Sequence, residues 1–411
     1  MAISSTKPSR SRRGRARILP SCSSNESHLR TLRVKQVRRR KTPAREDRIA
    51  RRAPCSQWAV IGQQTAGIVL GDGKYVETRR CRASRVLADM PDISQSPPPP
   101  VETTWHILHD ISAQVRWSIA CTALHNPETI LPPPVPLTQT RIHFSCESSL
   151  AVARRHSLLS FPAIKGSVTP ARIGVLSSAS SRRPGGGFNK RSSNHDAILS
   201  RSTSLIAPLS SPVGRTFYRG AIAQPSAMLY SPQVVGIRKD DDDSHQLVDD
   251  DFDGELDAIP ADPTTAGLEQ PPAVDGQTQR SMGEFVAPYA MNVLSAHPVR
   301  LPRSPKADRD LGVLRTELKS RLARALAVFA AHGDAVLVLT PFGCEEGVSV
   351  DVVAQTYAEL LACVSTDEGS TRFKNVFEEV VFAVPGKLHE PFRTAFEMRV
   401  YEDELMTALE V

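Results

Sequence analysis

Short apolar runs alternate with amphipathic segments along the second half of the chain, and this alternation limits the possible fold more than any other feature. Residues 335–339 form a continuous apolar run, which suits a central strand buried on both faces. Over 311–329 leucines recur at three- and four-residue steps, typical of a long amphipathic helix that Gly333 ends. Further strands are expected at 141–146, 172–176, 291–296 and 379–384, and further helices at 148–156, after His195 and at 350–364. The sequence therefore predicts an α/β domain over 140–400, with a three-layer α/β/α arrangement and a mixed central sheet.

The start of the chain is set apart by its charge. Residues 1–52 hold 17 Lys and Arg against 3 Asp and Glu, whereas the whole chain carries a net charge of +7. Blocks of like charge repel and bury nothing, so residues 1–54 are predicted to be a disordered basic arm. Such an arm is either a plain solvated tail or a nucleic-acid contact, a nuclear import signal around 38–41, or a mitochondrial presequence. We expect a location in the nucleus or cytoplasm, with the mitochondrion as the alternative.

Two further stretches look weakly packed. Residues 55–139 contain proline runs at 97–100 and 132–134, so this region is expected to be weakly ordered, and 83–139 to be a linker. A short apolar pattern near 56–75 allows one N-terminal helix of the domain. Residues 239–280 are acidic and then rich in proline and glycine, which predicts a disordered insertion.

Cysteine usage and hydropathy exclude several classes of protein. The seven cysteines include no CxxC pair, which suits free thiols better than a disulfide framework or a zinc site. No run of eighteen or more apolar residues occurs, so neither a spanning helix nor a membrane partner is expected. No metal-ligand spacing and no nucleophile-base spacing stands out, and we expect neither a metal nor a cofactor.

A glycine run follows directly after the strand expected at 172–176. Gly185, Gly186 and Gly187 lie between Pro184 and Phe188. Glycine carries no Cβ atom, so a bulky ligand can approach the backbone amides closely. A strand that leads through such a loop into a helix is a frequent place for a phosphate or a sugar. Taken alone, the run also fits a plain glycine-rich turn.

Five separated motifs give the run a context. The segment 171–180 leads into 184–188, and it is followed in order by segments 201–205, 228–232, 293–298 and 337–344. In this order the motifs resemble the microbial-type poly(ADP-ribose) glycohydrolase catalytic domain family, over about 141–384. The resemblance implies a macrodomain-like fold whose partner is ADP-ribose or an ADP-ribosylated protein, held in a crevice at the strand ends. It also implies a set of ligand-binding residues: Gly185, Gly186, Gly187, Phe188, Gly343, Cys344 and Gly347.

The expected catalytic motif is altered. Family members that cleave the polymer carry Gln-Glu-Glu after the glycines, and the second Glu protonates the leaving ribose hydroxyl. A gap-free alignment from Phe188 to Arg201 puts His195, Asp196 and Ala197 at these positions. Ala197 has no proton to donate, and loss of a general acid typically costs roughly 10²- to 10⁴-fold in rate. Asp196 or His195 is the substitute acid; the ordinary alternative is a helix-dipole contact for Asp196 and a solvated His195.

The second loop also departs from the family. Glu345 and Glu346 precede Gly347, where relatives carry a small glycine after Gly-Cys. A carboxylate beside a diphosphate repels it by about 1 kcal/mol or more unless it turns outward. The sequence therefore predicts an ADP-ribose-binding protein with weak or lost glycohydrolase activity. An active ADP-ribosyl glycohydrolase that uses Asp196 or His195, and a nucleic-acid-associated scaffold that binds through residues 1–52, are the alternatives.

Overall fold

The computed structural model describes residues 53–82, 102–136, 139–159, 172–190, 192–240, 283–299, 311–364 and 373–409. The chain divides into two compact units, Met1–Arg48 and Ile49–Val411. The first unit lies outside the described residues, and so does 241–282. The predictions of a disordered arm and of a disordered insertion therefore fall almost wholly on residues outside the description.

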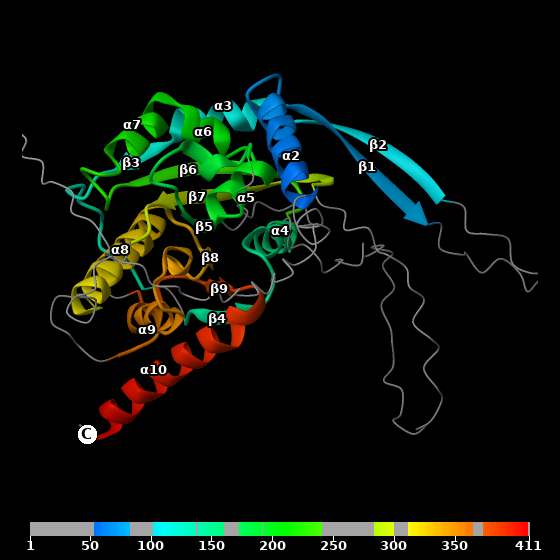
Figure 1. Ribbon diagram of the computed structural model, residues 1–411. Helices are drawn as coiled ribbons and strands as arrows, with labels where there is room; N and C mark the ends of the chain where they lie inside the picture. The colour runs from blue at the N-terminus through cyan, green and yellow to red at the C-terminus, as the bar shows by residue number, and fades with distance from the viewer. Residues whose placement is uncertain are drawn as a thin grey trace, which may run out of the picture. The chain divides into compact units, whose positions relative to one another are not determined.

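A seven-stranded sheet forms the centre of the second unit, with the order β3-β6-β7-β5-β8-β9-β4 (Figure 1). The strands are β3 Ala123–His125, β4 Arg141–Ser145, β5 Ile173–Ser178, β6 Met228–Arg238, β7 Phe285–Ala296, β8 Val336–Leu339 and β9 Glu379–Ala383. From β7 to β4 all neighbours pair in parallel, whereas β6 runs antiparallel to both β7 and β3. The predicted α/β class with a mixed central sheet is confirmed.

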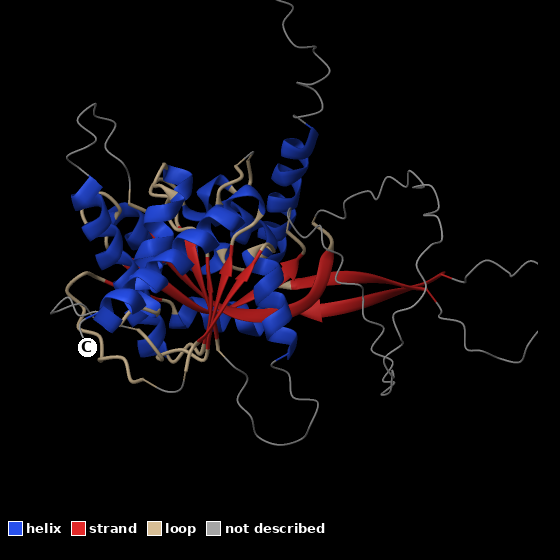
Figure 2. Cartoon of the chain, turned by 90° about the horizontal axis from the view of Figure 1, so that it is seen from below, coloured by secondary structure: helices blue, strands red, loops and turns tan. Residues whose placement is uncertain are grey.

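Helices cover both faces of this sheet (Figure 2). They are α2 Ala53–Val69, α3 Ser112–Cys121, α4 Ser149–Leu159, α5 His195–Ser202, α6 Ile206–Ser210, α7 Pro212–Gly220, α8 Leu311–His332, α9 Val350–Leu361 and α10 His389–Leu409. Short 3₁₀ helices are η1 Pro184–Gly187, η3 Cys344–Glu346 and η4 Gly386–Leu388. In β5, Val175 packs on the side of α4 and α5, and Leu176 packs on the side of α8 and α9. The alternation of strand side chains thus separates two apolar layers, which confirms the three-layer arrangement.

The strongest sequence patterns fold as predicted. All four residues of β8 are buried, as expected for a strand covered on both faces. Helix α8 buries the stripe that includes Leu318 and Leu322, and Gly333 follows it with a φ of 69°. A left-handed residue directly after a helix is the usual place for glycine, because glycine has no Cβ atom to clash. Among the described residues, no helix combines the length and apolar character needed to cross a membrane.

The expectation of a linker over 83–139 is wrong for much of that region. Strand β2 Glu102–Asp110 pairs with β1 Lys74–Arg82 in a separate two-stranded antiparallel ribbon (Figure 1), and α3 and β3 follow it. Trp105 and Leu108 remain 59% and 67% exposed. Elements that bury so little apolar surface carry no clean hydrophobic period, so the pattern in the sequence did not reveal them.

Two element boundaries also differ from the prediction. Strand β7 begins at Phe285 and so contains Pro288, which was expected to precede the strand. The pairing of β6 with β7 is interrupted between Gly236 and Arg238, next to the proline. A proline is tolerated in a strand where no ladder hydrogen bond is needed from its nitrogen. Helix α10 was not predicted, and it extends the domain to Leu409.

Candidate ligand-binding site

The two predicted ligand loops lie at one edge of the sheet. Strand β5 leads into the glycine loop that contains η1, and β8 leads into the loop that contains η3. Because β5 and β8 are neighbouring parallel strands, their carboxyl ends lie side by side, where open α/β sheets bind ligands. The two loops also touch: the His195 N–H donates to Glu345 Oε2 at 3.5 Å. The two loops that the resemblance assigns to the ligand therefore contact one another.

The glycine loop is shaped by positive backbone angles. Gly185, Gly186 and Gly187 have φ values of 66°, 55° and 84°. A Cβ added to Gly185 would lie 2.8 Å from Ser200 Oγ, and one added to Gly186 would collide with the Asn194 side chain. At Gly187 the nearest atom, Ser192 Cβ, would be 3.8 Å away. Gly185 and Gly186 are thus required by internal packing and backbone conformation, whereas a side chain at Gly187 would meet open space. The contact of the three glycines with a ligand stays a prediction.

Phe188 follows the three glycines and packs into the protein core. Its N–H donates to the Gly185 carbonyl at 2.8 Å, and its side chain is 7% exposed. It packs in an apolar cluster that also contains Ala197 and Ile206. Phe188 thus supports the glycine loop through its side chain, and its predicted contact with a ligand stays a prediction.

Helix α5 begins directly after this loop, and its first turn carries the altered motif. The side chain of Asn194 caps the helix by accepting from the Ala197 N–H at 2.9 Å. His195 is half-buried: Ser178 N–H donates to its Nδ1 at 3.5 Å, and its Nε2 lies 2.9 Å from Ser149 Oγ. Burial lowers the pKa of His195 to about 4, because a charged ring would lose its water. His195 is therefore neutral at pH 7 and has no imidazolium proton to give a substrate.

Asp196 points into the protein, behind the glycine loop. The side chain is fully buried, and its Oδ2 accepts from the Ser180 N–H at 3.0 Å and from the Tyr218 hydroxyl at 3.4 Å. Burial, with a smaller contribution from the charge of Glu345, raises the pKa of Asp196 to about 7. Such a pKa suits a general acid at neutral pH, but the carboxyl group has no surface that a substrate could touch.

Ala197 occupies the position expected for the catalytic glutamate. Its side chain is fully buried in the cluster with Phe188 and Ile206. The chain thus places a core methyl group where active relatives need a proton donor.

The second loop is built between two left-handed glycines. Gly343 and Gly347 have φ values of 91° and 96°, and the Val348 N–H donates back to the Gly343 carbonyl at 3.2 Å. Between them, burial raises the pKa of the Cys344 thiol to about 11, so the thiol stays protonated and unreactive at neutral pH. Glu345 lies nearest to α5, and loss of water raises the pKa of its carboxyl, which Glu346 raises further.

Helix α2 packs against the glycine loop, a contact that the sequence did not predict. A Cβ added to Gly62 would lie 2.5 Å from the Phe188 carbonyl oxygen, so α2 and the loop are in close contact. Thr65 Oγ1 donates to the Arg201 carbonyl at 2.6 Å. The Arg201 guanidinium, almost fully buried, lies 4.9 Å over the Trp58 ring and donates to the Ser192 carbonyl at 2.6 Å. No local pattern predicts these contacts, since the partners lie far apart in the sequence.

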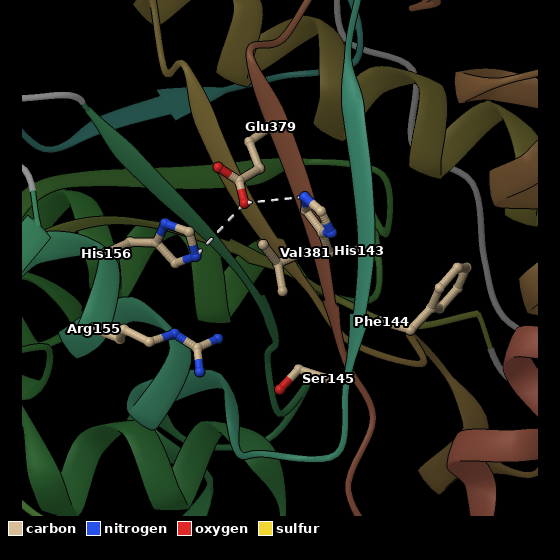
Figure 3. A pocket seen from close by; sticks show the side chains of 7 residues that line it. All are labelled: His143, Phe144, Ser145, Arg155, His156, Glu379 and Val381. Carbon is tan, nitrogen blue, oxygen red and sulfur yellow. Dashed lines mark ion pairs between the residues drawn. The ribbon is translucent and has the colours of Figure 1, made fainter. Parts of the chain in front are cut away.

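A separate cavity of about 390 Å³ opens between α4 and the strands β4 and β9 (Figure 3). It is lined by His143, Phe144, Ser145, Arg155, His156, Glu379 and Val381. Glu379 Oε1 lies 3.6 Å from His143 Nε2 and 3.9 Å from His156 Nε2. None of the predicted site residues lines this cavity. Within the described ranges, no three His, Cys, Asp or Glu side chains gather closely enough to hold a metal ion.

Comparison with known families agrees with the motifs. Residues 105–239 match the family model described as microbial-type PARG, catalytic domain, where PARG is poly(ADP-ribose) glycohydrolase. The predicted resemblance to this family is thereby confirmed over these residues. The match begins at Trp105, within the region that was predicted to be a linker, and it includes the glycine loop and α5.

Solved structures of the Thermomonospora curvata PARG share the fold. The PARG of Thermomonospora curvata has a TM-score of 0.56 and 23% identity, covering 84% of this chain and 99% of its own. The same protein bound to the inhibitor ADP-HPD gives a TM-score of 0.53 and 22% identity, with the same coverage. The PARG of Deinococcus radiodurans in complex with ADP-ribose gives a TM-score of 0.48 and 22% identity, covering 70% of this chain and 96% of its own. No curated protein matches the chain.

Proposed function

We propose that this microbial-type PARG domain binds ADP-ribose, free or attached to protein, between the glycine loop and the Gly343 loop, and has weak or lost glycohydrolase activity. One observation carries the proposal: the two loops meet at the first peptide N–H of α5, at the carboxyl ends of the neighbouring strands β5 and β8. Peptide N–H groups at a helix start attract the phosphates of a nucleotide.

The family supports the choice of ligand. The Thermomonospora curvata PARG, which has this fold, is solved with the inhibitor ADP-HPD. In this chain the two loops contain glycines in left-handed backbone at Gly187, Gly343 and Gly347. The predicted departures from the family concern side-chain charge and the proton donor, which affect affinity and rate.

Three observations argue against fast hydrolysis. Ala197 is a buried methyl group, His195 is neutral at pH 7, and Asp196 has no exposed surface. A missing general acid slows a glycosidic cleavage by roughly 10²- to 10⁴-fold. We therefore expect binding without efficient turnover.

Calorimetry and a turnover assay test the two parts of the proposal separately. Full-length protein titrated with ADP-ribose should give a saturable heat, while poly(ADP-ribose) should be cleaved no faster than roughly 10²-fold below an active PARG assayed beside it. No heat at millimolar ADP-ribose would remove the binding proposal. Turnover equal to the active enzyme would remove the claim of weak activity.

One observation favours an active hydrolase as a second candidate. Asp196 has a pKa of about 7, which suits proton donation if the glycine loop opens. The polymer-cleaving rate should then fall as pH rises above about 7, and Asp196→Asn should abolish it. Unchanged turnover in Asp196→Asn would exclude this assignment. Binding of nucleic acid through residues 1–52 stays a prediction, tested by a strongly salt-dependent affinity that is lost when these residues are deleted.

A further inference from the structure

The side chain of Glu345 is the point at which the second loop touches α5. Its Oε2 accepts from the His195 N–H, and it forms no ion pair among the residues that the structure describes. The N–H of Ala197, two residues further along the helix, is already used by the Asn194 cap. The Glu345 carboxylate thus lies against the start of α5. A negative group at this position is favoured by the partial positive charge of the helix start.

The surroundings of Glu345 are acidic. Its charge acts on Asp196 in α5 and on Cys344 in its own loop, raising the pKa of both. Glu346 follows it, and Asp351 of α9 also acts on Cys344. The imidazole of His195, at the start of α5, is uncharged at pH 7.

We propose that Glu345 is a built-in competitor for anionic ligands: its carboxylate occupies the peptide N–H position at α5 that the diphosphate of ADP-ribose would use. This inference rests on the proposed ADP-ribose function and adds to it a residue that sets the affinity. Binding requires the Glu345 side chain to turn away, and the negative charge of Glu345 opposes the incoming diphosphate. Repulsion between unit charges a few ångströms apart in water corresponds to about a fivefold change in affinity.

Protonation of Glu345 removes the negative charge of its side chain, so it should raise the affinity for ADP-ribose. Loss of water and the neighbouring Glu346 raise the pKa of Glu345, so a larger share of it is neutral at mildly acidic pH than for a free glutamate. The affinity for ADP-ribose should therefore rise as pH falls toward 5. Protonation of Asp196 contributes to the same trend, so the comparison between variants isolates the share that belongs to Glu345.

The test is calorimetry of the full-length chain with ADP-ribose and with adenosine, which lacks the diphosphate. Glu345→Gln should bind ADP-ribose about fivefold more tightly than the wild type at pH 7.5. Adenosine should bind both equally. Glu346→Gln is the matched control, because it removes a neighbouring charge but not the contact with α5, and it should change the affinity less. The rise in affinity at low pH should be smaller in Glu345→Gln than in the wild type.

The outcomes separate the two proposals. If neither the wild type nor Glu345→Gln binds ADP-ribose, the proposed function fails. If both bind with the same affinity, the function stands and the competitor role of Glu345 is wrong. Weaker binding by Glu345→Gln, or an equal gain with adenosine, would also overturn that role, and thermal unfolding of each variant shows whether it is folded.

Discussion

Replacement of Gly62 by alanine tests whether helix α2 supports the ligand loop. An added Cβ would lie 2.5 Å from Phe188 O, 3.0 Å from Phe188 C and 3.1 Å from Asn189 Cα. All three atoms are backbone, so the crowding is relieved only if the helix or the loop moves. Gly67 is the matched control: it lies in the same helix, is exposed, and an added Cβ there meets nothing within 4 Å.

The two substitutions should shift stability in different directions. Alanine stabilises a helix interior by about 1 kcal/mol over glycine, so Gly67→Ala should stabilise the protein by about that amount. The same gain applies at Gly62, but extra atoms in a packed site cost about 1–3 kcal/mol. The two variants should therefore differ by about 1–3 kcal/mol in free energy of unfolding, with Gly62→Ala the less stable.

Chemical denaturation followed by circular dichroism measures this difference, and ADP-ribose titration measures its effect on the site. Gly62→Ala should also bind ADP-ribose more weakly, because the crowded atoms belong to Phe188 and Asn189, which follow the ligand glycines. Gly67→Ala should bind as the wild type does. Equal stability and equal affinity in the two variants would refute the claim that α2 sets the position of this loop.

Two further predictions concern a buried acid and a helix end. Burial raises the pKa of Asp196 from 3.8 to about 7, so the folded state binds the Asp196 proton more tightly than the unfolded state does. The protonated carboxyl therefore stabilises the fold fully below pH 3.8, and this stabilisation is lost as pH rises through about 7. Denaturation at pH 4 and pH 8 should show a loss of up to about 4 kcal/mol that is absent in Asp196→Asn; an identical pH dependence in both proteins would contradict the burial of the carboxyl. Gly333→Ala should lower the free energy of unfolding by about 1–2 kcal/mol, because the φ of Gly333 is 69°. Gly312→Ala, where an added Cβ meets nothing within 4 Å, should raise it by up to about 1 kcal/mol. Equal effects of the two substitutions on the melting temperature would refute the left-handed cap.

The parts of the fold that were predictable are those with strong local signals. Strand β8 has a continuous apolar run, and α8 has a regular stripe that ends at Gly333, so both follow from residue order alone. The glycine run was singled out because glycine has no Cβ atom, whereas the Gly343 loop was located by the resemblance to the family. The resemblance also implied that both loops border one crevice at the strand ends.

The parts that were missed depend on contacts between distant residues or on exposed elements. The ribbon of β1 and β2 leaves Trp105 largely exposed, so its residues resemble a linker in composition. Thr65 and Arg201 are 136 residues apart, and no pattern within either segment reveals that they bond. The burial of Phe188 and Asp196 is likewise set by α2, α6 and α7 packing over the loop rather than by the motif itself.

Amide hydrogen exchange of the full-length protein with and without saturating ADP-ribose tests the central claim most directly. The account predicts slower exchange on ligand addition in the backbone of 185–198 and 343–348, where the two loops and the start of α5 meet. Protection confined to other segments, such as those around His143 and Glu379 at the separate cavity, would contradict the assignment of the binding site.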